Sequence, residues 1–181
     1  MDDTATPSPT FQITDDPSAS ETTPDPSLGI WSIYYYKDEF NQPTTKQHIS
    51  TASYFTGTFS NSATTDSSLS VNVAVDSDGI FFTLFEYSRG NPVKNSSTRN
   101  DVTYNILMRT EDDSRYTIAG TMNAGSERVR IDDRYKSVVI TALSGEGSIS
   151  FHLVQEDRPT TTYLFSVRAS NFAYVYKSLG L

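Results

Sequence analysis

The chain contains no cysteine among its 181 residues. This absence excludes disulfide bonds, a thiolate nucleophile and any metal site built on cysteine. Histidine is nearly as scarce: only His48 and His152 occur, and they show no metal-binding spacing. The serines show no G-x-S-x-G elbow of the kind that hydrolases use. We therefore predict no catalytic residue, no cofactor and no metal site.

Long apolar runs are also missing, so the sequence predicts no membrane-spanning helix, and it shows no signal peptide. Basic residues are scattered singly, as at Arg89, Lys94 and Arg109, and they form no stripe. Proteins that bind nucleic acid concentrate their basic residues on one surface. We therefore predict that nucleic acid is not a partner.

The first 28 residues differ in composition from the rest of the chain. They hold five of the eight prolines and six acidic residues, but no lysine or arginine. Such a segment cannot bury enough apolar surface to offset the entropy lost on ordering. We predict a disordered, acidic tether over residues 1–28. Residues 29–181 then form one domain with 16 acidic and 14 basic residues, a nearly balanced charge.

After residue 29 the apolar residues recur at every second position. Leu69, Val71, Val73 and Val75 alternate with mostly polar residues, and after a break at 76–79 a second apolar run covers 80–87. This pattern predicts a β-hairpin whose first strand has one face on a core. The second strand is apolar on both faces, so we expect it to be central or covered on both sides. Similar runs predict strands over 30–36, 54–59, 102–108, 116–122, 148–155 and 161–168.

Two segments have helical features. Residues 170–179 carry apolar residues at helical spacing, with Ser170 as a possible cap and Gly180 able to end the helix. Residues 134–143 fit either a helix or a strand, and we favour a short helix. The sequence thus predicts a mainly β domain, an antiparallel β-sandwich or a partly open barrel, with a C-terminal α-helix.

The 76–79 break begins like a calcium-binding loop. However, Ile80 and Phe81 follow where a calcium loop needs further oxygen ligands. Aspartate and glycine are also typical of tight turns. We therefore interpret this segment as a turn.

Tyrosines provide the candidate ligand-binding residues. Tyr34 and Tyr36 share one face of the predicted first strand, and with Tyr87 they could form a flat platform for a sugar or a protein. The alternative, which we favour, is cross-strand packing of these rings.

The run Gly57-Thr58-Phe59-Ser60-Asn61-Ser62-Ala63-Thr64-Thr65, followed by Leu84-Phe85-Glu86-Tyr87 and Asn91-Pro92-Val93-Lys94, resembles uncharacterised Bacteroides-type envelope lipoproteins. The resemblance implies a mature chain that starts at a lipidated cysteine followed by acidic residues. Asp2 and Asp3 fit this pattern, and Met1 stands where the cysteine would be. It implies a cell-envelope or cell-surface location through a removed N-terminal lipid anchor, and it implies no activity. Within the run, Gly57 allows close backbone approach, and Asn61 belongs either to a loop tied to its own backbone or to a recognition loop.

These features together favour a non-catalytic extracytoplasmic binding or structural module whose partner is an unknown protein or glycan. Tyr34, Tyr36, Tyr87 and Asn61 are its candidate ligand-binding residues. One alternative is a carbohydrate-binding module that uses the tyrosines. The other is a hydrolase in which His48 or His152 meets an acid or a serine.

Overall fold

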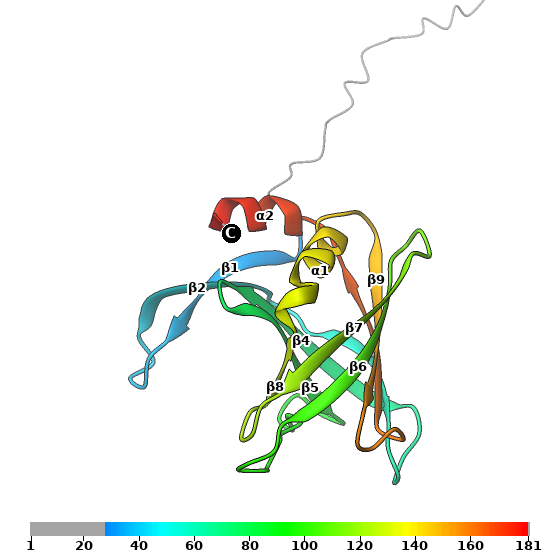
Figure 1. Cartoon of the computed structure of the whole chain (residues 1–181). Helices are drawn as coiled ribbons and strands as arrows, with labels where there is room; N and C mark the ends of the chain where they lie inside the picture. The colour runs from blue at the N-terminus through cyan, green and yellow to red at the C-terminus, as the bar shows by residue number, and fades with distance from the viewer. Residues whose placement is uncertain (1–27, 181) are drawn as a thin grey trace, which may run out of the picture.

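The computed structural model describes residues 28–180, and within them the chain forms a closed, antiparallel, eight-stranded β-barrel with a two-stranded extension and two α-helices (Figure 1). The predicted tether therefore lies, except for Leu28, outside the described residues. The strands are β1 (Trp31–Lys37), β2 (Pro43–Thr51), β3 (Phe55–Ser60), β4 (Ser67–Asp76), β5 (Gly79–Glu86), β6 (Val102–Arg109), β7 (Arg115–Met122), β8 (Arg128–Ile131), β9 (Ser148–Gln155) and β10 (Thr162–Arg168).

The barrel closes through the hairpin of β4 and β5. Around the ring the order is β4, β3, β10, β9, β6, β7, β8 and β5, and β5 pairs with β4 again. The mainly β prediction is confirmed. Of the two predicted architectures, the sandwich is wrong and the barrel is present, although it is closed and not partly open. Both architectures bury alternate residues of each strand, so the period of two does not separate them.

The strands β1 and β2 form an extension on the side of the barrel. In β2 only Ile49 pairs with β4, and its partner there is Val75. Val75 lies outside the part of β4 that pairs with β3. The extension is anchored by the buried Trp31, whose amide N–H donates to Asn171 Oδ1 and whose carbonyl accepts from Asn171 Nδ2, both at 3.0 Å. The Trp31 indole N–H also donates to the Arg168 carbonyl at 2.9 Å.

Helix α1 (Lys136–Leu143) follows a 3₁₀ turn, η1 (Asp133–Tyr135), and helix α2 is Phe172–Leu179. Both helices lie toward the same end of the barrel (Figure 1), and Val139 and Leu143 of α1 are buried in its core. Both predicted helices are confirmed, and Gly180 ends α2 with a left-handed φ of 75°. Ser170 does not cap α2, because the residue before the helix is Asn171.

Alternate side chains fill the interior of the barrel. Those of β4 predicted to face the core are buried. On β5 one face is buried and the other, with Phe81 and Phe85, is only half-buried, so this strand is not fully covered on both sides. The rings of Phe82, Phe151 and Phe165 contact one another at centroid distances of 5.1–5.5 Å. The predicted turn at 76–79 is also present, with Asp76 Oδ1 accepting from the amides of Asp78 and Gly79. Because these aromatic side chains fill the middle of the barrel, any space for a ligand must lie at its ends.

Candidate functional site

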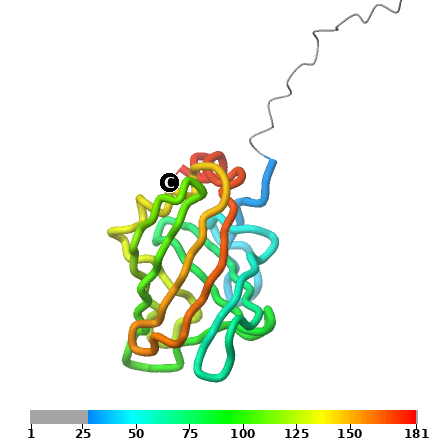
Figure 2. Tube along the Cα trace, turned by 90° about the vertical axis from the view of Figure 1, so that its right-hand side faces the viewer, coloured from blue at the N-terminus to red at the C-terminus, as the bar shows by residue number. Residues whose placement is uncertain are grey.

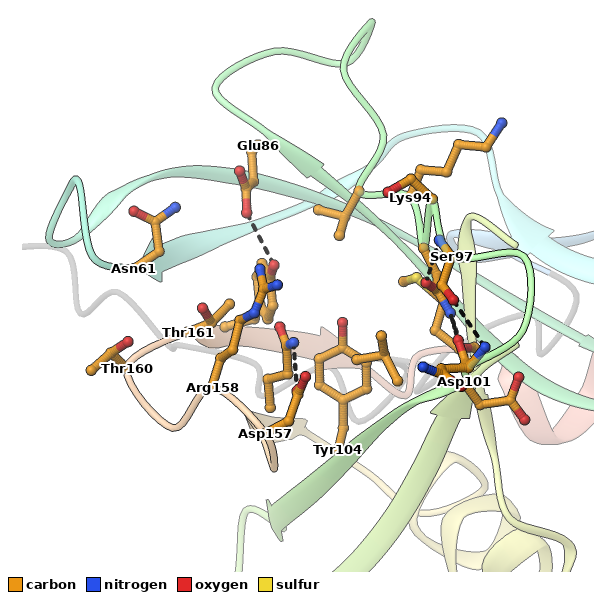
Figure 3. A pocket seen from close by; sticks show the side chains of 18 of the residues that line it. Asn61, Glu86, Lys94, Ser97, Asp101, Tyr104, Asp157, Arg158, Thr160 and Thr161 are labelled. Carbon is orange, nitrogen blue, oxygen red and sulfur yellow. Dashed lines mark hydrogen bonds between the residues drawn. The ribbon is translucent and has the colours of Figure 1, made fainter. Parts of the chain in front are cut away.

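The end of the barrel opposite the helices holds a cavity of about 860 Å³, here called the mouth cavity. Figure 2 shows the loops that follow β3 and β9 at this end of the molecule, far from α2. The ends of β5, β7 and β9 and the starts of β6 and β10 bring side chains from distant parts of the sequence to it. The residues that define it include Asn61, Glu86, Lys94, Asp101, Tyr104, Asp157, Arg158 and Tyr163 (Figure 3).

Two buried tyrosines line the inner end of the mouth cavity. Tyr104 of β6 is 2% exposed and Tyr163 of β10 is 1% exposed, and their ring centroids are 6.3 Å apart. The Tyr163 hydroxyl donates a hydrogen bond to Glu86 Oε1 at 3.0 Å. The Tyr104 hydroxyl has no hydrogen-bond partner among residues 28–180, and Figure 3 shows it directed into the cavity.

Both phenols are held in the neutral form. Burial raises the pKa of Tyr104 to about 12, and the negative charges of Asp157 and Glu86 act in the same direction. Burial, followed by the charge of Glu86, also raises the pKa of Tyr163 above its usual range. Nearby negative charges thus add to the effect of burial at both hydroxyls.

Buried amide side chains hold the loops around the mouth cavity. Asn95 Nδ2 donates to the carbonyls of Asn100 at 2.8 Å and Met122 at 3.1 Å, and its Oδ1 accepts from the Ser97 amide at 3.1 Å. Gln155 Nε2 donates to Asp157 Oδ1 at 2.7 Å. These bonds fix the β5–β6 loop and the β9–β10 turn, so the mouth cavity is formed before any ligand binds.

Of the residues that the sequence singled out, only Asn61 lies at the mouth cavity. Its Oδ1 accepts from the amides of Ala63 and Thr64 at 2.9 and 3.1 Å, so it ties the loop to its own backbone. Tyr87 follows Glu86 at the end of β5, is 58% exposed, and packs its ring 4.9 Å from that of Phe59.

Tyr34 and Tyr36 lie elsewhere, on the β1–β2 extension. Their rings pack against His48, at centroid distances of 5.8 and 4.4 Å. The Tyr36 hydroxyl donates to Asp76 Oδ2 at 2.7 Å. Asp76 belongs to the turn before β5, whereas Tyr87 follows the end of β5. The structure thus brings Tyr34 and Tyr36 together around a histidine and leaves Tyr87 apart from them.

Neither histidine has the neighbours of a catalytic group within residues 28–180. Burial lowers the pKa of His48, with a further contribution from the charge of Arg128, and its buried Nδ1 has no hydrogen-bond partner there. His152 pairs in register with Leu107 and Leu164 on the outer face of the barrel. No nucleophile–base pair is formed by either histidine in this part of the chain.

Across the described residues, no three histidine or acidic side chains group into a possible metal site. No helix in the same part of the chain is both long enough and apolar enough to cross a membrane.

Comparisons with protein-family models, with curated proteins and with solved structures returned no match to this chain. The site is therefore defined by its geometry alone. Sequence reasoning did not single out Glu86, Tyr104 or the Tyr163 hydroxyl, because inward-facing aromatic residues of a strand are usually core. The sequence did contain one indication: both inward positions carry a tyrosine, and a phenol oxygen at a buried position needs a hydrogen-bond partner.

Proposed function

We propose that this protein is a non-catalytic binding module that holds one small polar molecule in the mouth cavity. The observation that carries this proposal is the Tyr104 hydroxyl, which belongs to a 2% exposed side chain, opens into the cavity and has no partner in residues 28–180. Its oxygen is not one of the fully buried polar atoms that lack a partner, so it is accessible from the cavity. A ligand can therefore form a hydrogen bond with it, and such a bond contributes about 0.5–1.5 kcal/mol net.

The size and the position of the cavity support the same proposal. Ligand sites in proteins typically have volumes of roughly 300–1,000 Å³ and often lie in the mouths of β-barrels, and the mouth cavity has about 860 Å³. An eight-stranded barrel has an interior that side chains just fill or that holds one small ligand. Here the phenylalanine rings fill the middle of the barrel, so a ligand inside the barrel has room only toward one of its ends.

The chemistry of the lining supports a binding role. Acids, bases, amides and hydroxyls surround the mouth cavity, as at Glu86, Arg158 and Asn61. Tyr104 and Tyr163 stay protonated at neutral pH, so they act as hydrogen-bonding groups and not as bases. The expected ligand is accordingly polar.

A ligand screen followed by two matched variants tests the proposal. We expect a library of small polar metabolites to contain binders that shift the backbone amide NMR signals of residues 86, 95–97, 155–158, 160 and 161. Tyr104→Phe should weaken such a binder about two- to ten-fold, the value of one neutral hydrogen bond. Tyr36→Phe, the same change on the β1–β2 extension, should leave the affinity unchanged. A library without any binder, or signals that shift only around Tyr34 and Tyr36, would contradict the proposal.

The extracytoplasmic location and the N-terminal lipid anchor remain predictions from the resemblance. The roles of Tyr34, Tyr36 and Tyr87 in glycan binding, and of His48 or His152 in hydrolysis, likewise remain predictions. The codons that precede Asp2 in the gene test the anchor: a leader and a cysteine there support it, and their absence opposes it.

A further inference from the structure

The Glu86 carboxylate has unused capacity to accept hydrogen bonds. Its only hydrogen bond within residues 28–180 comes from the Tyr163 hydroxyl to Oε1. An ionised carboxylate has about four acceptor positions. In the same part of the chain, no lysine or arginine forms a salt bridge with Glu86, although the residue is only partly exposed. The Glu86 carboxylate can therefore accept further hydrogen bonds from a ligand.

Negatively charged side chains outnumber positively charged ones around the mouth cavity. Three acidic residues and two basic residues line it. Of the two basic residues, Lys94 lies with its Nζ 3.7 Å from Oε1 of Glu127, which is not among the lining residues, so its charge is largely matched outside the cavity. Arg158 is exposed in the β9–β10 turn. Burial raises the pKa of Tyr104 first of all, and the charges of Asp157 and Glu86 raise it further.

The hydroxyl of Tyr104 adds a second acceptor on another strand. Figure 3 shows Tyr104 and Glu86 directed into one cavity from different strands. An ammonium group has three N–H donors and no acceptor, so it can donate to more than one acceptor oxygen. A carboxylate or phosphate ligand would instead meet the charge of Glu86.

From these observations we infer that the ligand of the mouth cavity is a small organic cation with an ammonium group, for which Glu86 is the counter-ion and Tyr104 a second hydrogen-bond acceptor. This inference rests on the proposed function, because it names the class of molecule that the same cavity binds. Arg158 is the one basic side chain of the lining that could compete for Glu86.

Three probes of the same shape and different charge test the inference: cyclohexylmethylamine, cyclohexylmethanol and cyclohexanecarboxylate. Each is titrated into the whole chain at pH 7 and low salt, with affinity measured by calorimetry and the site mapped by amide NMR. We expect the amine to bind at least ten-fold more tightly than the alcohol, and the carboxylate to bind more weakly than the alcohol. The affinity for the amine should fall as salt is added.

Glu86→Gln and Arg158→Gln are the matched variants. Glu86→Gln keeps an oxygen that can accept from Tyr163, and we expect it to remove most of the preference for the amine over the alcohol, about ten-fold or more. Arg158→Gln removes a charge of the opposite sign from the same cavity, and we expect unchanged or several-fold tighter binding of the amine. Thermal unfolding of both variants checks that each is folded.

The outcomes separate the two proposals. An alcohol or carboxylate that binds in the mouth cavity as tightly as the amine would overturn the ammonium inference and leave the proposed function standing. A preference for the amine that survives in Glu86→Gln would also overturn the inference. If neither these probes nor the metabolite library shifts the signals of the mouth cavity, both proposals fail.

Discussion

Tyr104→Phe and Tyr163→Phe remove the same atom from two nearly equally buried rings of one cavity, and we expect them to change stability differently. The two side chains are 2% and 1% exposed. Only the Tyr163 hydroxyl has a hydrogen-bond partner, the Glu86 carboxylate, among residues 28–180. The pair of variants therefore isolates one hydrogen bond while ring packing stays the same.

The expected difference follows from the partners of the two hydroxyls. A hydrogen bond to a charged group contributes about 1.5–3 kcal/mol, and because Glu86 is partly exposed we expect about 1.5 kcal/mol for Tyr163→Phe. Tyr104→Phe removes a buried hydroxyl that has no such bond. We expect its free energy of unfolding to stay within about 0.5 kcal/mol of the parent protein, or to rise. For a domain of this size, 1.5 kcal/mol corresponds to a decrease in Tm of about 3–6 °C.

Urea unfolding of the ligand-free protein measures both variants. The midpoint should move to lower urea for Tyr163→Phe and stay in place for Tyr104→Phe, with unchanged slopes. The double variant Tyr163→Phe with Glu86→Gln should lose less than the sum of the two single changes, because Glu86→Gln weakens the same bond that Tyr163→Phe removes. A loss for Tyr104→Phe as large as that for Tyr163→Phe would refute the reasoning, since it would mean that the Tyr104 hydroxyl already has a partner.

Two further predictions concern stability. A Cβ at Gly57 would lie 2.1 Å from the Leu164 carbonyl oxygen and 2.8 Å from Phe165 Cβ, so we expect Gly57→Ala to cost about 3 kcal/mol in urea unfolding. Gly90→Ala, where a Cβ meets no atom within 4 Å, should be neutral or slightly stabilising, and similar costs at both sites would contradict this account. Alkaline pH should destabilise the protein, because the pKa of Tyr104 rises from 10.0 to about 12 on folding. The unfolded chain therefore loses the Tyr104 proton at a lower pH than the folded protein does. Between those two pKa values, the contribution of Tyr104 to the free energy of unfolding falls by about 1.4 kcal/mol per pH unit. Urea midpoints measured from pH 9 to 11.5 should therefore fall less steeply for Tyr104→Phe, and equal slopes would refute the shift.

The alternation of apolar residues predicted most of the strands but not the way in which they join. Leu69, Val71, Val73 and Val75 are all buried, as their period of two predicts. That period shows which face of a strand is buried and says nothing of which strand lies beside it. The closure of the barrel depends on the pairing of β5 with β8, which are separated in sequence by β6 and β7.

Two strands escaped prediction for different reasons. β2 begins with polar residues and contributes one fully buried apolar side chain, Ile49, so its sequence shows little amphipathic pattern. β8 alternates arginine with apolar residues but has only four residues, too few for a pattern to stand out. Both strands form because neighbouring strands supply their hydrogen-bond partners.

The mouth cavity was still harder to predict. Tyr104 and Tyr163 occupy inward positions of their strands, where aromatic residues usually belong to the core. Whether such a position lies in the middle of a barrel or near its opening depends on strand order and stagger, which local patterns do not encode. Asn61 was singled out from its loop, and the structure places it at the cavity. The Gly57 prediction, close backbone approach, is confirmed by its position against Leu164.

NMR spectra of protein with isotope-labelled tyrosine rings, recorded before and after saturation with a binder from the metabolite screen, test most directly whether the barrel mouth is the binding site. We predict that the ring signals of Tyr104 and Tyr163 shift, because both side chains line the mouth cavity. The signals of Tyr34 and Tyr36, which pack around His48 on the extension, should stay in place. Shifts at Tyr34 and Tyr36 with none at Tyr104 and Tyr163 would contradict the account.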